Sequence, residues 1–459
     1  MARPLWGSRV QAPLTPTAAR ISSSIDVDRP LAAHDVAATR AHVDQVHAIG
    51  LVDDAGRDRL LAALDEVSNE IADGSFAWDE AAEDVHMNVE RSIRARVGEE
   101  LAGQLQAGRS RNEEIVTDER LWLKDALHRL DEGLLALQRS LLRRAEDEVA
   151  TVMPAHTHTQ PAQPVLLAHH LHAYVEIFAR DRERLADAAA RLDRSPAGSG
   201  AAVGSGLPLD REAIAEALGF SAITTNSLDA VASRDYALEV VAATAITFTD
   251  LGRLAADLVL WSTPYFGFAR IPDGYATGSS MLPNKRNPDV AELIRGRSAR
   301  ATAALAGMFG VLHGLPLGYH RDLQELRGPM LETIGSLELC LTAADEMVAG
   351  VTFDRDAMGN AAQAGHALAT ALAERLTAAG VPFRTAHWRV GELVAEAESR
   401  GVDLAALPAD LLRDRLPELA TNPNPIPSVA DALAAADVPG GTAPGRVRQA
   451  LDTTKEHLA

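Results

Sequence analysis

The chain has 459 residues, of which 47 % are hydrophobic and 4 % aromatic, and its formal net charge is −20. Such an acidic chain lacks the surplus of Lys and Arg with which proteins bind nucleic acids. It contains no run of about twenty apolar residues, and residues 1–20 lack the apolar core of a secretory signal. The single cysteine, Cys340, excludes an intrachain disulfide. We therefore expect a soluble, cytoplasmic protein with no nucleic-acid or membrane partner.

Long helices are predicted first, from the placement of proline. Alanine and leucine favour helix, and proline breaks helix interiors, so long stretches without proline permit long helices. No proline occurs between Pro30 and Pro154. Three segments are predicted as the longest helices: about Arg111–Val152, about Pro164–Arg194 and about Ser227–Trp261.

The third of these helices is unusually apolar. Between Tyr236 and Thr249 its only charged residue is Glu239. A helix that is apolar on nearly every side is buried on nearly every side. This segment therefore predicts a large bundle or an oligomer core. After about Phe353 prolines and glycines concentrate, which predicts a small irregular C-terminal domain.

Short polar stretches, here called polar islands, interrupt the predicted helices. The first is GRSRNEE, just before the first long helix. Ser110 and Glu113 have the spacing of a capping box, which is a purely structural interpretation. Cations and an amide near a helix N-terminus also suit an anion clamp. The residues of that clamp are Arg109, Arg111 and Asn112.

The second island is HTHTQPAQP, followed closely by His169, His170 and His172. Several histidines in a short stretch raise the question of a metal. However, the chain has no HExxH, no paired cysteines and no carboxylate at zinc-like spacing, so we expect no metal. His158 stands in a proline-bounded turn and is the better candidate for proton transfer.

Two glycine-rich stretches remain. GSGAAVGSG, within residues 195–208, lacks the pattern of a P-loop and suits a flexible loop or lid. GSSMLPNKRNP, Gly278–Pro288, combines hydroxyls with cations and rigid prolines. Ser279 or Ser280 could transfer a proton there if backbone N–H groups and Lys285 stabilised the alkoxide. An ordinary surface turn is the alternative.

Taken together and in this order, these islands resemble the aspartase/fumarase superfamily, and within it the argininosuccinate lyases. GSSMLPNKRNP matches the superfamily signature GSSxMPxKxNP except at Leu282. Further matches run along almost the whole chain: LWGSR, SSSIDVDRPLAAHDV, EDVHMNVERSI, GRSRNEE, THTQPAQP, NSLDAVASRDYALE, LPLGYHRDLQE and GGTAPGRV.

The resemblance implies an all-α, three-domain aspartase/fumarase-like fold. An N-terminal helical domain (residues 1–107) would precede a central long-helix bundle with the signature loop (108–352) and a small C-terminal domain (353–459). It also implies a homotetramer whose twenty core helices come from four chains, with each active site shared among three of them. No cofactor is expected.

The implied reaction is the reversible elimination of arginine from argininosuccinate, a small-molecule substrate, which releases fumarate. By resemblance, Ser279 is the base, Lys285 meets the substrate carboxylate, and His158 is a catalytic histidine with Glu292 as its charge partner. The implied substrate-binding residues are Ser24, His86, Ser110, Arg111, Asn112, Thr157, Asn287, Tyr319, Gln324 and Arg327.

The chain departs from the argininosuccinate lyase pattern at a few positions. Where those lyases read SRNDQ, this chain has Glu113 and Glu114, and where they have Lys after DLQE-D it has Arg327. An added charge near a site for two carboxylates is unfavourable unless it faces away or meets a cation. A carbon–nitrogen lyase for another N-substituted aspartate, or a catalytically silent structural relative, are therefore the alternatives.

Overall fold

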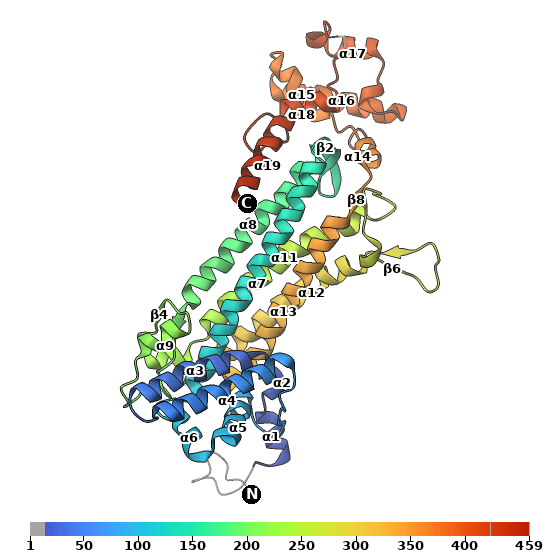
Figure 1. Ribbon diagram of the computed structural model, residues 1–459. Coiled ribbons are helices and arrows are strands. Elements are labelled where there is room, and N and C mark those ends of the chain that lie inside the picture. Colours follow the sequence, from blue (N-terminus) through green and yellow to red (C-terminus); the bar gives the residue numbers. More distant parts are fainter. Residues whose placement is uncertain (1–13, 423, 459) are drawn as a thin grey trace. The chain divides into compact units, whose positions relative to one another are not determined.

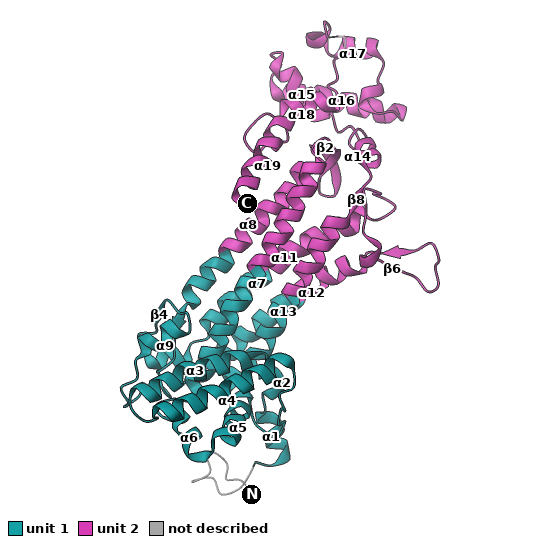
Figure 2. Cartoon of the chain, viewed as in Figure 1, with its two compact units in different colours: residues 1–130, 184–245, 300–336 teal, residues 131–183, 246–299, 337–459 magenta. Residues whose placement is uncertain are grey.

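The computed structural model describes residues 14–422 and 424–458 (Figure 1). The LWGSR motif at residues 5–9 lies outside the described part of the chain. The chain forms two compact units, residues 1–130, 184–245 and 300–336 and residues 131–183, 246–299 and 337–459 (Figure 2). The three-domain division stays a prediction.

Five helices of 24 to 37 residues dominate the fold, and each contributes a segment to both units. They are α7 (Arg111–Asp147), α8 (Leu167–Leu192), α11 (Asp235–Trp261), α12 (Asp289–Leu312) and α13 (Arg327–Gly350). The mostly helical fold confirms the all-α prediction. Among the described helices, none is both long and apolar enough to cross a bilayer.

The first unit also holds the shorter N-terminal elements, whose apolar faces form one core that includes Val43, Leu64 and Ile93. Its helix α4 begins at an Asp53 side-chain cap and ends at Gly74, whose left-handed φ of 77° stops the helix. The unit comprises α1 (Pro16–Ser22), α2 (Ile25–Asp28), α3 (Ala32–Ala48), α4 (Asp54–Asp73), α5 (Val85–Val97), α6 (Glu99–Gly103), β3 (Arg194–Ser195), α9 (Arg211–Ala217), β4 (Ala222–Ile223) and α10 (Ser227–Ala232).

The second unit carries a separate small core among its C-terminal helices, with Leu376, Leu393 and Leu412 buried together. Its shorter elements are β1 (Val152–Thr157), β2 (Gln160–Leu166), β5 (Ala269–Arg270), β6 (Thr277–Gly278), β7 (Arg286–Asn287), β8 (Thr352–Phe353), α14 (Arg355–Ala361), α15 (Ala369–Ala378), α16 (Phe383–Arg400), α17 (Ala409–Arg415), α18 (Val429–Ala435) and α19 (Pro444–Leu458).

The three predicted long helices are present, with differences at their ends. Helix α7 stops at Asp147 and α8 begins only at Leu167, because residues 152–166 form the antiparallel hairpin β1–β2. The segment predicted from Ser227 is two helices, α10 and α11, separated at Ser233 and Arg234. At this break the buried side chain of Arg234 pairs with Glu119 at 3.1 Å.

Within α11, the apolar stretch Tyr236–Thr249 is largely buried as predicted. Ile246 and Thr249 are its exposed positions. Ile246 has 42 % of its surface exposed in the single chain. The prediction of all-round burial is therefore met at most positions, and Ile246 is the apolar exception.

Candidate active site

The N-terminus of α7 is capped by its own polar island. The Ser110 hydroxyl accepts the N–H of Asn112 at 3.3 Å, and the Glu113 carboxylate accepts the N–H of Ser110 at 3.2 Å. The same Glu113 carboxylate accepts the N–H of Gly200 at 2.8 Å. Burial raises the pKa of Glu113. The Glu113 half of the capping box is therefore present, whereas the Ser110 hydroxyl meets the N–H of Asn112 and not that of Glu113. Glu113 also ties the helix start to the glycine-rich loop.

The glycine-rich loop needs glycine where it turns towards α7. Gly200 has a φ of +60°, and a Cβ there would lie 2.4 Å from the carbonyl oxygen of Gly204. The Asn112 side-chain amide donates to the Ala201 carbonyl at 3.1 Å. This hydrogen bond and the one from the Gly200 N–H to Glu113 hold the glycine-rich loop against the start of α7.

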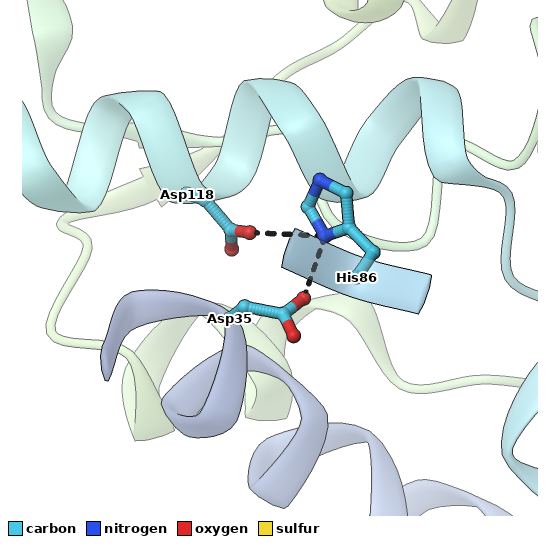
Figure 3. Close-up of side chains that lie close together, drawn as sticks. All are labelled: Asp35, His86 and Asp118. Atoms are coloured by element: carbon cyan, nitrogen blue, oxygen red, sulfur yellow. Dashed lines mark hydrogen bonds and ion pairs between the residues drawn. The ribbon is translucent and has the colours of Figure 1, made fainter. Parts of the chain in front are cut away.

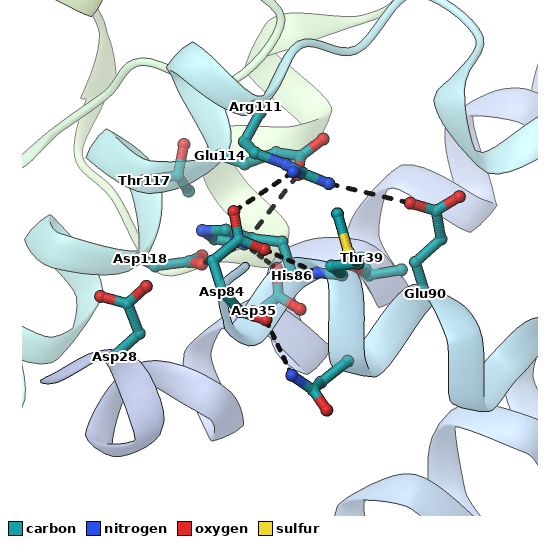
Figure 4. Close-up of polar contacts among 12 residues, drawn as sticks. Asp28, Asp35, Thr39, Asp84, His86, Glu90, Arg111, Glu114, Thr117 and Asp118 are labelled. Carbon is teal, nitrogen blue, oxygen red and sulfur yellow. Dashed lines mark hydrogen bonds and ion pairs between the residues drawn. The ribbon is translucent and has the colours of Figure 1, made fainter. Parts of the chain in front are cut away.

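The arginines of the same island are paired within the chain. Arg111 Nη1 lies 3.2 Å from the Asp84 carboxylate, and its Nη2 lies 3.9 Å from Glu90 (Figure 4). Arg109 Nε lies 3.2 Å from Glu114, and its Nη1 donates to Thr39 at 2.9 Å. In the single chain, both arginines of the predicted anion clamp are thus paired with carboxylates of the same chain.

A buried cluster surrounds His86, which Asp84 places by capping α5 through the N–H of Met87 at 2.8 Å. The Nδ1 atom of His86 lies 2.8 Å from Asp35 Oδ1 and 3.5 Å from Asp118 Oδ2 (Figure 3). Its Nδ1 is also 4.0 Å from Glu114 Oε2. The cluster therefore joins α3, α5 and α7.

Charge and burial oppose each other in this cluster. Burial alone would lower the pKa of His86, but the Asp35 carboxylate and its hydrogen bond outweigh it and raise that pKa to about 10. Burial, reinforced by the Asp35 charge, raises the pKa of Asp118 well above its ordinary value. Burial also acts on Asp35, but the cations His86 and Arg109 hold its pKa below the ordinary value.

A second buried network surrounds Arg327, which the sequence resemblance placed at the substrate. Its Nη1 pairs with Asp28, and its Nε lies 3.1 Å from Glu119 Oε1. Burial lowers the pKa of Arg327, but Asp28 and Glu119 raise it further than burial lowers it. Arg327 is 2 % exposed, so in this structure both of its charge partners belong to the chain.

The neighbours of Arg327 complete that network. The Ser24 hydroxyl donates to the second oxygen of Asp28 at 2.5 Å, and the Tyr236 hydroxyl donates to Glu119 Oε2 at 2.6 Å. Tyr319 and Gln324 are half-buried. Burial raises the pKa of Tyr319, against the opposing charge of Arg327.

In the second unit, His158 lies at the tip of the β1–β2 hairpin, in a turn as predicted. Thr157 pairs with Gln160, so the turn consists of His158 and Thr159 alone. Their φ values of 55° and 59° are left-handed, a conformation that two-residue hairpin turns require and that Asn-Gly favours. His158 and Thr159 are exposed and have a backbone conformation that residues other than glycine rarely adopt. Such strained positions are common at functional sites.

The signature loop forms a second hairpin in the same unit. Thr277 pairs with Asn287, and Gly278 pairs with Arg286, so residues 279–285 form the loop between β6 and β7. The Ser279 hydroxyl oxygen accepts the N–H groups of Met281 at 3.2 Å and Leu282 at 3.0 Å. Two backbone donors aimed at one oxygen stabilise negative charge on it.

The other candidates of this unit flank that loop. Lys285 is exposed and its N–H donates to the Leu282 carbonyl at 3.0 Å. Asn287 ends the hairpin and is half-buried, and Glu292 lies exposed in the first turn of α12. Gly278 lies in the strand pair, and a Cβ there would meet no atom within 4 Å.

The candidates therefore fall in two sets, one in each unit. The first unit holds Ser24, His86, Ser110, Arg111, Asn112, Tyr319, Gln324 and Arg327, and the second holds Thr157, His158, Ser279, Lys285, Asn287 and Glu292. Sequence reasoning missed the buried charges that contact the first set: Asp28, Asp35, Asp118 and Glu119. The sequence signals that could have found them are the family-like stretch SSSIDVDRPLAAHDV, which contains Asp28 and Asp35, and the four-residue spacing of Glu114 and Asp118 on one helix face.

Family models and full-length relatives identify the family of the chain. A family model described as "Lyase" matches residues 9–303, and one described as "Argininosuccinate lyase C-terminal" matches residues 366–439. An argininosuccinate lyase from Mycolicibacterium smegmatis is 44 % identical over 454 residues, covering 99 % of this chain and 97 % of that protein. A second, from Hyphomonas neptunium, is 42 % identical and covers 99 % and 98 %.

A solved structure shares the fold along the chain. The crystal structure of EDDS lyase in complex with formate superposes with a TM-score of 0.81 at 25 % identity, covering 98 % of this chain and 91 % of that one. Its likeness in sequence is weaker than that of the two full-length relatives. On the family models and those relatives together, the chain belongs to the argininosuccinate lyase family.

Proposed function

We propose that the chain catalyses the reversible β-elimination of arginine from argininosuccinate, with release of fumarate. The observation that carries this proposal is the 44 % identity to an argininosuccinate lyase along 99 % of the chain. The family match of the C-terminal segment at residues 366–439 supports the same substrate class.

Ser279 is the proposed base. Its alkoxide removes the proton from the substrate carbon beside a carboxylate, and the electron pair moves into that carboxylate. The pair then forms the double bond of fumarate as the C–N bond breaks, and the departing nitrogen of arginine keeps the electrons of that bond and takes up a proton from a general acid. The N–H groups of Met281 and Leu282 support an alkoxide at Ser279, since they already donate to its oxygen.

Lys285 and Asn287 are proposed to hold the carboxylate on which charge develops, and both flank Ser279 in one hairpin. His158 and Glu292 are proposed to act as a histidine with its charge partner, because a carboxylate beside imidazole orients it and raises its pKa. The proposed substrate-binding residues are Ser24, His86, Ser110, Arg111, Asn112, Thr157, Tyr319, Gln324 and Arg327.

The working form is proposed to be a cytoplasmic homotetramer with shared active sites. Large apolar side chains are exposed on the long helices of the single chain: Ile246 (42 %), Leu293 (61 %), Phe309 (53 %) and Leu339 (60 %). Exposed apolar side chains on bundle helices favour burial against further copies. The exposure of His158 and Lys285 also supports a site completed by another chain.

A lyase with the same chemistry but another N-substituted aspartate is the second candidate. The likeness to EDDS lyase, at a TM-score of 0.81, is the observation that favours it. The two candidates differ in the amine that leaves, since both release fumarate.

The test is to incubate the purified protein with argininosuccinate and to follow fumarate by its ultraviolet absorbance. Turnover with argininosuccinate supports the first candidate. Fumarate from another aminosuccinate, without turnover of argininosuccinate, supports the second. Silence on every such substrate contradicts both, and a stable and active monomer contradicts the shared-site proposal.

A further inference from the structure

The His86 cluster contains a carboxylate whose chemistry the proposed reaction does not use. Asp118 is fully buried, and neither of its oxygens accepts a hydrogen bond from any residue that the structure describes. Its Oδ2 atom faces Nδ1 of His86 at 3.5 Å (Figure 3). A buried carboxylate without hydrogen-bond donors is costly unless a cation or a proton meets it.

The three facing side chains have the donor set of a metal site. One ligand atom each from Asp35, His86 and Asp118 lies within 4.8 Å of the other two, and all three residues are buried. A tetrahedral ion with bonds of about 2.0–2.1 Å places its ligand atoms about 3.3 Å apart. The separations from His86 Nδ1, 2.8 Å to Asp35 and 3.5 Å to Asp118, require shifts of about half an ångström. The two carboxylate oxygens lie within 4.8 Å of each other and must reach the same spacing around the ion.

The charges around these three residues favour a divalent ion. The nearest cation, Arg109, has its own carboxylate partner in Glu114 at 3.2 Å. Arg111 is likewise paired with Asp84. An ion that displaces the protons held by His86 and Asp118 meets two carboxylates and a neutral imidazole, which together carry a charge of −2, and imidazole among the ligands favours transition metals over Mg²⁺ and Ca²⁺.

We propose that Asp35, His86 and Asp118 form a binding site for one divalent transition-metal ion. The ion joins α3, α5 and α7, because each helix supplies one ligand. The ion fixes the ring of His86 and the packing of these helices, since the β-elimination already has its base and charge-stabilising groups elsewhere in the chain, and His86 Nε2, which has no hydrogen-bond partner among the described residues, is left to meet the substrate. Binding therefore raises the melting temperature, as does any ligand that binds the folded state alone.

The test uses Co²⁺ as the probe on full-length, chelator-treated protein, with calorimetry, visible absorption and thermal melting. The expected result is one cluster-bound Co²⁺ per chain and a higher melting temperature, with both effects lost in Asp118→Asn. Loss of a ligand weakens binding by more than about 100-fold, above the effect of an outer-shell change. The matched control is His47→Gln, which alters an exposed His–Asp pair (His47 Nε2 to Asp54 at 2.8 Å) and leaves cluster binding unchanged.

Equal Co²⁺ binding by wild type and a folded Asp118→Asn variant overturns the proposal, as does no binding by wild type. In the latter case a proton on His86 bridges the two carboxylates instead. Should Asp118→Asn not fold, crystals of wild-type protein soaked in Co²⁺ give a direct answer. An anomalous peak among the three ligand atoms supports the site, and its absence there contradicts it. Neither result depends on fumarate release, so the proposed reaction is judged separately.

Discussion

Glu114 Oε1 lies 3.2 Å from Nε of Arg109, and both side chains are buried at 4 % and 8 % exposure. Glu114 was the departure that raised a question about substrate, because another negative charge opposes the binding of two carboxylates. In the structure that charge meets a cation of the same chain. The departure therefore bears on the stability of the first unit.

Glu114→Gln tests this assignment. The substitution leaves Arg109 buried without its charge partner, so we expect the free energy of unfolding to fall by about 1–3 kcal/mol. The KM for argininosuccinate should stay within about threefold of the wild-type value, which corresponds to about 0.6 kcal/mol. Urea denaturation and steady-state kinetics measure the two quantities. Glu100→Gln, at an exposed position of α6, is the matched control for both. A KM lowered tenfold or more by Glu114→Gln would instead show that Glu114 repels the substrate.

Arg327→Lys tests the second buried network. A lysine has one charged nitrogen and cannot reproduce the contacts of Arg327 to both Asp28 and Glu119, so one buried carboxylate loses its partner. We expect the free energy of unfolding to fall by about 2 kcal/mol or more. The control is Arg321→Lys, six residues earlier, where the guanidinium is 46 % exposed. That control should change stability by about 0.5 kcal/mol or less. An equal change in the free energy of unfolding for Arg327→Lys and Arg321→Lys would show that the buried contacts of Arg327 do not stabilise the fold more than an exposed ion pair does.

His42 makes the first unit sensitive to acid. Burial and the charge of Arg109 lower the pKa of His42 from 6.5 to about 3, while its Nε2 lies 3.1 Å from the Ala107 carbonyl oxygen. Below pH 6.5 His42 is protonated in the unfolded chain, whereas in the folded chain it is protonated only below about pH 3. Stability is therefore lost as the pH falls through this window, by about 2–3 kcal/mol at pH 4.5.

The measurement is the urea midpoint at fixed protein concentration between pH 7.5 and pH 4.5. His42→Gln keeps a donor for the Ala107 carbonyl and removes the titration, so its midpoint should fall less than that of wild type. His47→Gln, at a surface histidine, should follow the wild-type profile. Parallel profiles for wild type and His42→Gln would show that other groups cause the acid sensitivity.

The glycine-rich loop offers a pair of substitutions with opposite expected signs. Gly200→Ala places a Cβ 2.4 Å from a carbonyl oxygen at a φ of +60°, so it should destabilise the fold by about 1–3 kcal/mol. Gly206→Ala meets no atom within 4 Å and should be neutral or stabilising by up to about 1 kcal/mol. Thermal melting compares the two. Equal melting temperatures would contradict the tight turn at Gly200.

Much of the helical frame is predictable from the sequence, because proline placement and a high content of alanine and leucine are local signals. The C-terminal end of α7 and the start of α8 are not predictable in this way. The hairpin between them forms by the pairing of residues 152–157 with 160–166, which proline placement does not reveal. The break between α10 and α11 was not predicted either, and the partner that Arg234 meets there, Glu119, is more than a hundred residues away in the sequence, where no local pattern reveals it.

The candidate site divides in the same way. The motif residues Ser279, His158 and Arg111 were identifiable from their polar surroundings and from family resemblance. The partners of His86 were not identifiable, because Asp35 and Asp118 are buried acids in helices and single acids in helices are ordinarily exposed. Only the packing of α3, α5 and α7 brings these acids to His86.

The central claim is that Ser279 is the base of a fumarate-releasing elimination. The most direct measurement compares wild type, Ser279→Ala and the exposed control Ser399→Ala with saturating argininosuccinate, following fumarate by ultraviolet absorbance. We predict a loss of about 10³-fold or more in kcat for Ser279→Ala and wild-type turnover for the control. Circular dichroism and gel filtration confirm that fold and assembly are retained. A folded Ser279→Ala protein that keeps more than about a tenth of the wild-type kcat would contradict the account, because a positioned base contributes at least about 10²-fold.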